Sequence, residues 1–286
     1  MNPRMLPLWL ALLLLPAMAH ADEQSDMKRM AQEHQHDKPV PTQAAMEEPK
    51  QPVNAEEVTY GEVGGKPVRG YLAKPKNAQG ALPGIIVIHE WWGLNDNIRA
   101  MTRRLAGEGY QALAVDLYGG EKADNPDAAM KLVQATMQNR PAGEENLRQA
   151  AAYLERQGAP KLGVIGWCFG GGWSLGTALL LPDKIDATVI YYGHLETDKA
   201  KLATLKSPII GFFGEKDQSI PVASVREFEK SLKELGKPVE VHVYPGANHA
   251  FANASGGNYN PEAAKDAWER TRAFLARYLK GEAQKK

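Results

Sequence analysis

The sequence predicts an α/β fold, with a mostly parallel central sheet covered by helices on both faces and an antiparallel hairpin at its N-terminal side. Three observations support this fold. The chain has 286 residues, 43% of them hydrophobic, which suffices for a substantial core. After residue 56, strand-like and helical patterns take turns. Most strand-like runs are continuously apolar, as strands buried on both faces are.

Composition excludes several classes of function. Lys and Arg together number 34, as do Asp and Glu, so the chain lacks the basic balance of a general nucleic-acid binder. The single cysteine, Cys168, excludes a disulfide framework and a metal site built from several thiolates. We therefore expect no nucleic-acid partner and no metal, and the lone thiol needs its own explanation.

Residues 1–21 predict a cleaved signal peptide. Arg4 precedes an apolar run at 6–15, and residues 19–21 have the small-residue pattern of a cleavage site. The run is about ten residues long, whereas a membrane-spanning helix needs about 20. We expect cleavage before Asp22, export to the periplasm or the medium, and no stable insertion in a membrane.

Residues 22–55 predict a disordered linker. The segment is rich in charged residues, Gln, Met and Pro, and it contains no aromatic residue, Leu or Ile. Such a composition cannot form a packed core of its own. His34 and His36 lie in this segment close to Asp37, and a bound metal ion is the alternative to the solvated histidines that we expect.

A single folded domain is predicted at 56–280, followed by a tail at 281–286. It opens with a hairpin, because residues 56–63 and 68–73 alternate around a Gly-Gly pair. Further strands are predicted at 84–89, 111–115, 161–166, 187–191, 208–213 and 239–244. Parallel strands of this kind bind ligands at their carboxyl ends.

Helices are predicted between these strands. One begins after Asn125, a favourable N-cap residue, with Pro126 in the first helical position. The others are predicted at 98–108, 144–157, 170–181, 222–235 and 261–279. Because helices separate the strands, the connections fit a parallel sheet with helices on both faces.

The most informative segment is a Gly-x-Cys-x-Gly turn from Gly166 to Gly170, placed between a predicted strand and a predicted helix. A sharp strand-to-helix turn of this kind exposes a nucleophile, and its glycines are needed because side chains would not fit. The helix N-terminus also favours a thiolate at Cys168. The alternative is an ordinary glycine-rich turn with an inert, buried cysteine.

Two further candidates follow at strand ends. Asp217 comes after the strand at 208–213, and His249 comes after the strand at 239–244. Glu215 is an alternative acid two residues before Asp217. A nucleophile, an acid and a histidine in this chain order are typical of α/β-hydrolases.

With these motifs the chain resembles the dienelactone hydrolase family, whose members are cysteine-dependent α/β-hydrolases. The resemblance covers residues 56–280. It rests on six motifs in register: 88–95, 115–118, 166–172, 191–193, 214–221 and 246–251. It implies an α/β-hydrolase fold and the hydrolysis of an ester or lactone through an acyl-thioester, with no cofactor.

The resemblance also implies roles for individual residues. Cys168 is the expected nucleophile, His249 its general base and Asp217 the acid that orients the base. The glutamate at the position of Glu90 lies close to the sulfur in the family and takes up its proton when substrate arrives; a purely structural role for Glu90 is the alternative. Backbone N–H groups of Trp91 and Phe169 are the expected oxyanion donors.

Substrate recognition is where the chain departs from the family. Well-known members grip the dienelactone carboxylate with arginines, one of them shortly after the catalytic histidine, where this chain has Asn253. Losing a bidentate clamp changes what is bound. We expect Trp92, Tyr118, Tyr191 and Asn253 to contact a small-molecule ester or lactone, which need not be dienelactone. We expect a monomer or weak oligomer.

Other functions use the same residues. A thioesterase or a peptidase could employ the same nucleophile, base and acid. A non-catalytic binding protein, or a sensor that oxidises its thiol, could keep the fold without hydrolysing anything. An intact nucleophile, acid and base in order favours the hydrolase.

Overall fold

The structure of the protein is a computed structural model, and it describes residues 32, 34 and 39–282. The predicted signal peptide lies outside the described residues. The described strands form one eight-stranded sheet in the order β1-β2-β4-β3-β5-β6-β7-β8. They are β1 (Val53–Val63), β2 (Lys66–Pro75), β3 (Gly84–Ile88), β4 (Gln111–Val115), β5 (Leu162–Trp167), β6 (Ile185–Tyr191), β7 (Ile209–Gly214) and β8 (Val239–Tyr244).

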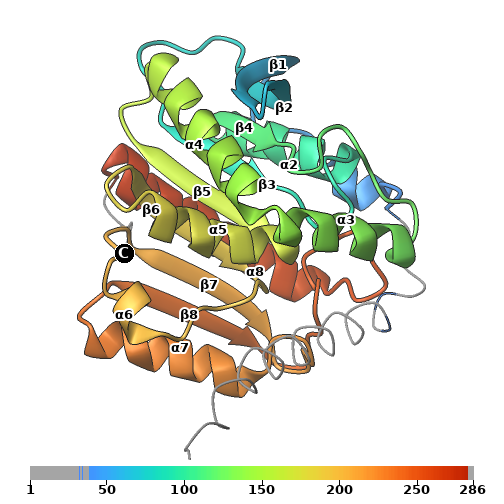
Figure 1. The fold of residues 1–286 in the computed structure, drawn as a ribbon, viewed down its shortest axis with the longest axis vertical. Coiled ribbons are helices and arrows are strands. Elements are labelled where there is room, and N and C mark those ends of the chain that lie inside the picture. Colours follow the sequence, from blue (N-terminus) through green and yellow to red (C-terminus); the bar gives the residue numbers. More distant parts are fainter. Residues whose placement is uncertain (1–31, 33, 35–38, 283–286) are drawn as a thin grey trace, which may run out of the picture.

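Strands β3 to β8 run parallel, and the predicted hairpin lies at one edge of the sheet (Figure 1). Strands β1 and β2 are antiparallel, and β2 pairs antiparallel with β4. Gly64 and Gly65, with φ of 58° and 75°, form the turn between them. Both lie in the left-handed region that a tight hairpin turn requires, which explains the Gly-Gly pair.

Helices cover both faces of the sheet, as predicted. Helices α2 (Asp96–Gly107) and α8 (Pro261–Leu275) cover one face, whereas α4 (Arg140–Arg156), α5 (Phe169–Leu180) and α7 (Val222–Glu234) cover the other. The remaining described helices are η1 (Gln43–Met46), α3 (Pro126–Gln138), α6 (Lys199–Leu202) and η2 (Ala276–Lys280). The N-cap prediction at Asn125 is confirmed, because its side chain accepts a hydrogen bond from Ala128 N–H at 2.9 Å.

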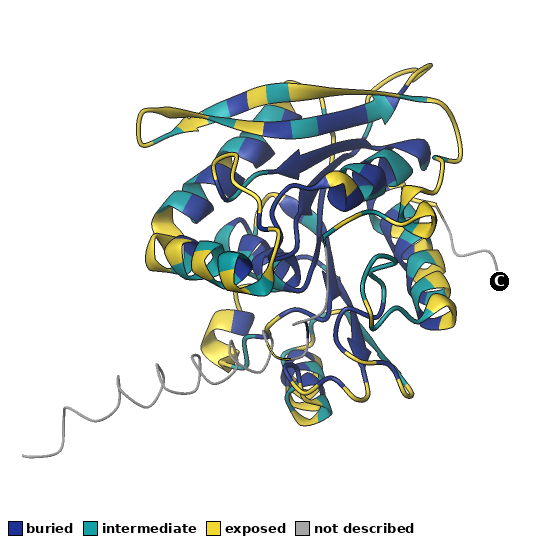
Figure 2. Cartoon of the chain, turned by 90° about the vertical axis from the view of Figure 1, so that its right-hand side faces the viewer, coloured by how far each residue is buried: buried dark blue, intermediate teal, exposed yellow. Residues whose placement is uncertain are grey.

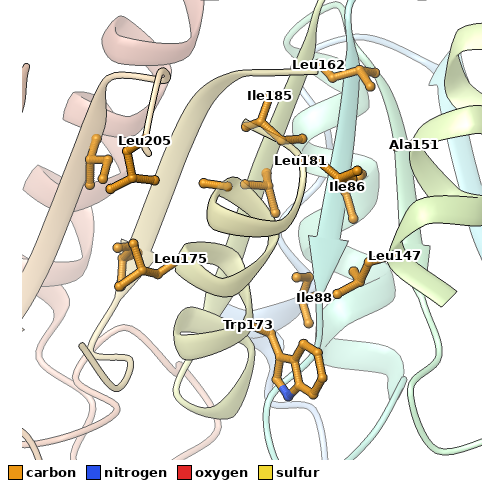
Figure 3. Close-up of a cluster of buried hydrophobic side chains, with 14 of the residues drawn as sticks. Ile86, Ile88, Leu147, Ala151, Leu162, Trp173, Leu175, Leu181, Ile185 and Leu205 are labelled. Carbon is orange, nitrogen blue, oxygen red and sulfur yellow. The ribbon is translucent and has the colours of Figure 1, made fainter. Parts of the chain in front are cut away.

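The core has two layers because strand side chains alternate between the faces. In β3, Ile86 and Ile88 pack with α4 and α5, while Ile85 and Val87 pack with α2 and α8. Figure 3 shows the first layer, where Trp173 of α5 lies near Ile88. Figure 2 shows that the central strands are buried and that exposed residues gather on the outer helix faces and the hairpin.

The described part of the predicted linker is attached to the domain, and β1 begins at Val53 rather than at 56. We call residues 39–52 the strap. Thr42 Oγ1 donates to Ala254 O at 2.8 Å, and Glu47 forms an ion pair with Arg104 at 3.0 Å. The strap thus differs from the expected disorder because its polar side chains find partners on the domain surface instead of a core of their own.

The C-terminal helix η2 lies next to the start of β5, a central strand of the sheet. Lys161, just before β5, donates from Nζ to Tyr278 O of η2 at 2.7 Å. Because β5 begins there and ends at Trp167, η2 and Cys168 lie at opposite ends of this strand. No helix in the described part of the chain is long and apolar enough to cross a membrane.

Candidate active site

Cys168 lies at the sharp turn between β5 and α5. Its φ of 55° and ψ of −117° place it in a strained conformation that non-glycine residues rarely adopt. The Cys168 N–H donates to Tyr191 O at 3.0 Å, which ties the turn to the neighbouring strand β6. The sulfur thus stands at the carboxyl end of the sheet and at the N-terminus of a helix, as the motif predicted.

The glycines around Cys168 are required by close backbone contacts. A Cβ on Gly166 would lie 2.1 Å from Gly170 O, and a Cβ on Gly170 would lie 2.4 Å from Ile88 O. Real Cβ atoms do not approach other atoms this closely, and backbone cannot move aside cheaply. The turn can therefore form only with glycine at both positions.

Asp217 and His249 meet beside the turn. Asp217 Oδ2 lies 2.8 Å from His249 Nδ1, and both side chains are fully buried. The other oxygen of Asp217 accepts hydrogen bonds from Ser219 N–H and Ile220 N–H, at 2.9 and 2.8 Å. A carboxylate held in this way orients the imidazole and stabilises its protonated form.

Glu215, the alternative acid, points elsewhere. It is exposed and accepts a hydrogen bond from Gly246 N–H at 2.9 Å. The carboxylate that contacts His249 is therefore that of Asp217. The two acids are only two residues apart, so the loop conformation after β7 decides between them.

The electrostatics of His249 link all three groups. Burial disfavours the charged imidazolium, but the Asp217 carboxylate and the Cys168 sulfur outweigh it and raise the pKa of His249 well above its ordinary value. Hydrogen bonds to both groups act in the same direction. The imidazole thus interacts with both the predicted acid and the predicted nucleophile.

The loop after β3 is held by His89 and Tyr118. His89 Nε2 accepts from Leu117 N–H at 3.2 Å, so Nδ1 carries the proton and donates to Glu90 O at 2.6 Å. Burial lowers the pKa of His89 and keeps it neutral. Tyr118 Oη donates to Trp91 O at 3.1 Å, so this tyrosine, expected to contact substrate, positions the loop.

Glu90 is nearly buried and paired with Asn253. The Asn253 amide donates to the two carboxylate oxygens at 3.0 and 3.4 Å. Asn253 itself is held by Ser255 N–H, which donates to its Oδ1 at 2.9 Å. The residue expected to contact substrate thus holds the glutamate, a role that no local sequence pattern reveals.

Aromatic rings enclose the site. Trp91 and Trp92 contact each other with ring centroids 4.9 Å apart, and both are buried. Tyr191, expected to contact substrate, bonds Thr271 Oγ1 through its hydroxyl at 2.7 Å. The ring next to His249 is that of Tyr192, at 5.2 Å, which has an unusual φ of 37°. The adjacent Tyr-Tyr pair in the sequence was the only signal for it.

His34 also reaches the site, although its segment was expected to be disordered and the histidine solvated. Its ring makes edge-to-face contacts with Trp91 and His249, at centroid distances of 5.6 and 5.4 Å. Only 3% of the residue is exposed. A histidine in a polar tract gives no sequence signal for such a contact, since nothing local encodes it.

A cavity of about 670 Å³ lies beside the site, between α2, α8 and the strap. Its lining includes Glu90, Tyr192, Asn253, Arg104, Trp268 and Glu47. The Arg104 guanidinium stacks over the Trp268 ring at 4.4 Å while it pairs with Glu47. Within the described residues, no cluster of three or more His, Cys, Asp or Glu side chains could hold a metal ion.

A nucleophile turn after a central parallel strand, with an acid and a histidine on later strand ends, defines an α/β-hydrolase. The sequence pattern of the dienelactone hydrolase family matches residues 68–279, and the chain belongs to this family. Family membership makes it a hydrolase of ester bonds.

Individual relatives agree with this assignment. The chain is 41% identical over 226 residues to Protein usf of Aquifex pyrophilus, covering 76% of this chain and 96% of the relative. It is 34% identical over 261 residues to a provisionally named carboxymethylenebutenolidase of Saccharolobus solfataricus, covering 78% and 99%. A crystal structure of a provisionally named dienelactone hydrolase from Klebsiella pneumoniae matches with a TM-score of 0.72 and 32% identity, covering 80% and 100%.

Proposed function

We propose that the protein is an exported, cysteine-dependent hydrolase of carboxylic esters or lactones, working through an acyl-thioester. The observation that carries this proposal is the buried Asp217–His249 pair, whose imidazole is hydrogen-bonded to the only thiol of the chain. Such a group of residues is what nucleophilic catalysis by cysteine requires.

Acylation begins when the Cys168 proton moves to His249 Nε2 and the sulfur attacks the carbonyl carbon. A C–S bond forms, and the carbonyl π electrons move to the oxygen. When the tetrahedral intermediate collapses, the C–O bond to the leaving group breaks, and His249 gives its proton to that oxygen. The products are an alcohol and a thioester on Cys168; from a lactone, the alcohol stays on the acyl chain.

Deacylation uses the same imidazole. His249 takes a proton from water, and the oxygen attacks the thioester carbon. The C–S bond then breaks, which releases the carboxylic acid and returns the sulfur as thiolate with the imidazolium beside it. Asp217 keeps the imidazole oriented during both acylation and deacylation and stabilises its positive charge, as the 2.8 Å contact between Asp217 Oδ2 and His249 Nδ1 allows.

The oxyanion of each intermediate needs N–H donors. We assign this role to the backbone N–H groups of Trp91 and Phe169. Phe169 is the first residue of α5, where N–H groups have no partner within the helix and the helix dipole favours negative charge. Trp91 lies on the loop that His89 and Tyr118 hold in place. Removing one such donor typically costs about 100–1000-fold in kcat.

Export is the second part of the proposal. It is supported by the Arg4, apolar and small-residue pattern of 1–21. The test is the mass of the protein recovered from the periplasm or medium of an expressing bacterium. A mature N-terminus at Asp22 agrees with the proposal, whereas recovery of the intact chain from the cytoplasm contradicts it.

The hydrolase is tested with nitrophenyl esters of short acids, using residues 22–286. We expect turnover by the native protein, and a loss of several orders of magnitude for Cys168→Ala, for His249→Ala and for the alkylated protein. Glu215→Gln is the matched control and retains turnover. A native protein that is folded and reduced, yet as inert as the alkylated one on esters, lactones and thioesters, contradicts the proposal and favours a binding or redox role.

The acyl-thioester is tested separately by mass spectrometry of protein mixed rapidly with substrate. We expect the mass of one acyl group on Cys168, and release of this group by hydroxylamine. Two results contradict the thioester route. One is an acyl group on a residue other than Cys168, and the other is turnover of the ester during which neither native protein nor His249→Ala carries an acyl group. Lactones, thioesters and peptides used in the same assay distinguish the three bond classes.

A further inference from the structure

We propose that His34 is a plug that occupies the reaction centre in the resting protein and must leave before substrate binds. This inference rests on the proposed function because it takes Cys168, His249 and the loop carrying Trp91 as the reacting groups. It concerns access to the nucleophile, which the hydrolytic mechanism does not address.

The position of His34 is the first reason. Its ring contacts Trp91, on the oxyanion side, and His249, on the general-base side. A reacting carbonyl must lie between these two sides, within reach of the sulfur. The imidazole of His34 therefore stands where the ester group and its leaving oxygen have to be.

Burial is the second reason. His34, with 3% exposed, is as deeply buried as core residues, although its segment is polar. Cys168 is only 5% exposed and His249 is fully buried. An acyl group therefore has no open path to the sulfur past Trp91 and His249 while the His34 ring is in place.

The strap is the tether for the plug. Thr42 is fixed to the loop that carries Asn253, through bonds to Ala254 O at 2.8 Å and Ser255 Oγ at 3.1 Å. Further along, Glu47 is paired with Arg104, and Gln51 Nε2 donates to Gly107 O at 3.0 Å. When His34 leaves, these contacts keep it close to the site and favour its return.

The size of the effect follows from population arithmetic. If the open state makes up about 0.1–10% of the resting protein, abolishing the closed state raises any rate that needs the open state by about 10–1000-fold. Both the alkylation of Cys168 and the hydrolysis of a small ester are such rates. Cys168 is the only cysteine, so a thiol reagent reports its exposure without ambiguity.

The experiment compares alkylation rates with iodoacetamide for residues 22–286 in native form and as His34→Ala, His34→Phe and Val40→Ala. Val40 is 63% exposed in the same segment and serves as the control. We expect His34→Ala to react at least about tenfold faster. His34→Phe, which keeps a ring of similar bulk, and Val40→Ala should react as slowly as native protein. Thermal unfolding establishes that all variants are folded.

Two results overturn the plug. If His34→Ala reacts no faster than native protein, His34 does not obstruct the thiol. If His34→Phe reacts as fast as His34→Ala, the obstruction is not a matter of bulk. Ester turnover is measured in parallel, and kcat/KM should rise with the alkylation rate. If native protein and all three variants are inactive on esters, the proposed hydrolase function is contradicted. The alkylation rates would still show whether His34 obstructs the Cys168 thiol.

Discussion

At the scale of single residues, the buried contact between Asp217 and His249 is the central feature of the proposed mechanism. Asp217 uses one oxygen for the imidazole and the other for two backbone N–H groups. The carboxylate is therefore fixed before substrate arrives, and it costs no reorganisation during the reaction. Its charge also raises the pKa of His249, so in the proposed mechanism the imidazole can hold the proton that it takes from Cys168.

The first prediction concerns this contact. Asp217→Asn keeps the shape but removes the charge and permits the wrong tautomer of His249. We expect kcat on a nitrophenyl ester to fall by about 10³–10⁴-fold, as in other triads. Steady-state kinetics measures it, with Glu215→Gln as the control that should stay within about twofold of native protein. A similar loss in both variants would contradict the assignment of the acid.

A second prediction concerns the pair of Glu90 and Asn253. Asn253→Asp replaces the amide donor by a second carboxylate at a contact of 3.0 Å in a nearly buried place. Two like charges cannot both ionise there without a large cost. We expect kcat/KM to fall by more than about tenfold in Asn253→Asp and by less in Asn253→Ala, which only removes the donor.

Measuring kcat/KM of both variants over a range of pH checks this prediction. Asn253→Asp should recover part of its activity at low pH, where one of the two carboxyl groups is protonated. Equal activity of the two variants at every pH would show that the contact between residues 90 and 253 is unimportant.

Single residues differ in how well the sequence predicts them. Cys168, Asp217 and His249 are recognisable because each follows a predicted strand, so the sheet brings them to one edge. The position of Tyr192 against His249, the contact of Asn253 with Glu90 and the insertion of His34 depend on loops meeting across the fold. Contacts between loops that are far apart in the sequence cannot be predicted from the spacing of residues along the chain.

At the scale of elements, the turn between β5 and α5 is the most constrained. The third prediction is that Gly170→Ala destabilises the protein strongly, since its Cβ would lie 2.4 Å from Ile88 O and 2.5 Å from His89 O. Overpacking of this kind costs about 1–3 kcal/mol or more in the free energy of unfolding. Thermal and urea unfolding measure it.

Gly172→Ala is the matched control for this prediction. Gly172 lies in the same helix turn, but the nearest atoms to its Cβ would be Cβ and N of His194, both at 3.4 Å, and O of His194 at 3.6 Å, which are ordinary contact distances. Alanine also favours helix by up to about 1 kcal/mol. We expect equal or higher stability for Gly172→Ala, and equal losses in the two variants would refute the steric explanation.

Elements themselves were predicted well, and their ends less so. The strands at 111–115 and 239–244 have the predicted bounds. Helix α4 begins at Arg140, before its predicted start at 144, because Pro141 fits the first turn of a helix. The short helices η1 and α6 were not predicted, since four residues carry no readable periodicity.

At the scale of the whole molecule, the buried tyrosines determine how the stability of the fold depends on pH in alkaline solution. Burial raises the pKa of Tyr60, Tyr110, Tyr118, Tyr191 and Tyr192 above their ordinary value. The folded state therefore holds phenol protons that the unfolded state releases. The stability that these protons provide is complete below about pH 10, the unfolded pKa, and is lost as the pH rises toward the folded pKa values.

The fourth prediction follows from this linkage. We expect cooperative unfolding above about pH 10, with tyrosinate absorbance and tryptophan fluorescence changing together. An alkaline titration with both signals measures it. Gradual ionisation of these phenols in a protein that keeps its native fluorescence would contradict the burial argument.

The opposite positions of η2 and Cys168 along β5 have a practical consequence. A carrier protein, a purification tag or a solid support attached on the C-terminal side of η2 joins the molecule next to the start of β5. The end of the sheet that carries Cys168 is then remote from the attachment and stays accessible to a dissolved substrate. Attachment close to the strap would instead place the foreign group beside the reaction centre. Immobilised enzyme for screening collections of esters is therefore best built from the C-terminal side.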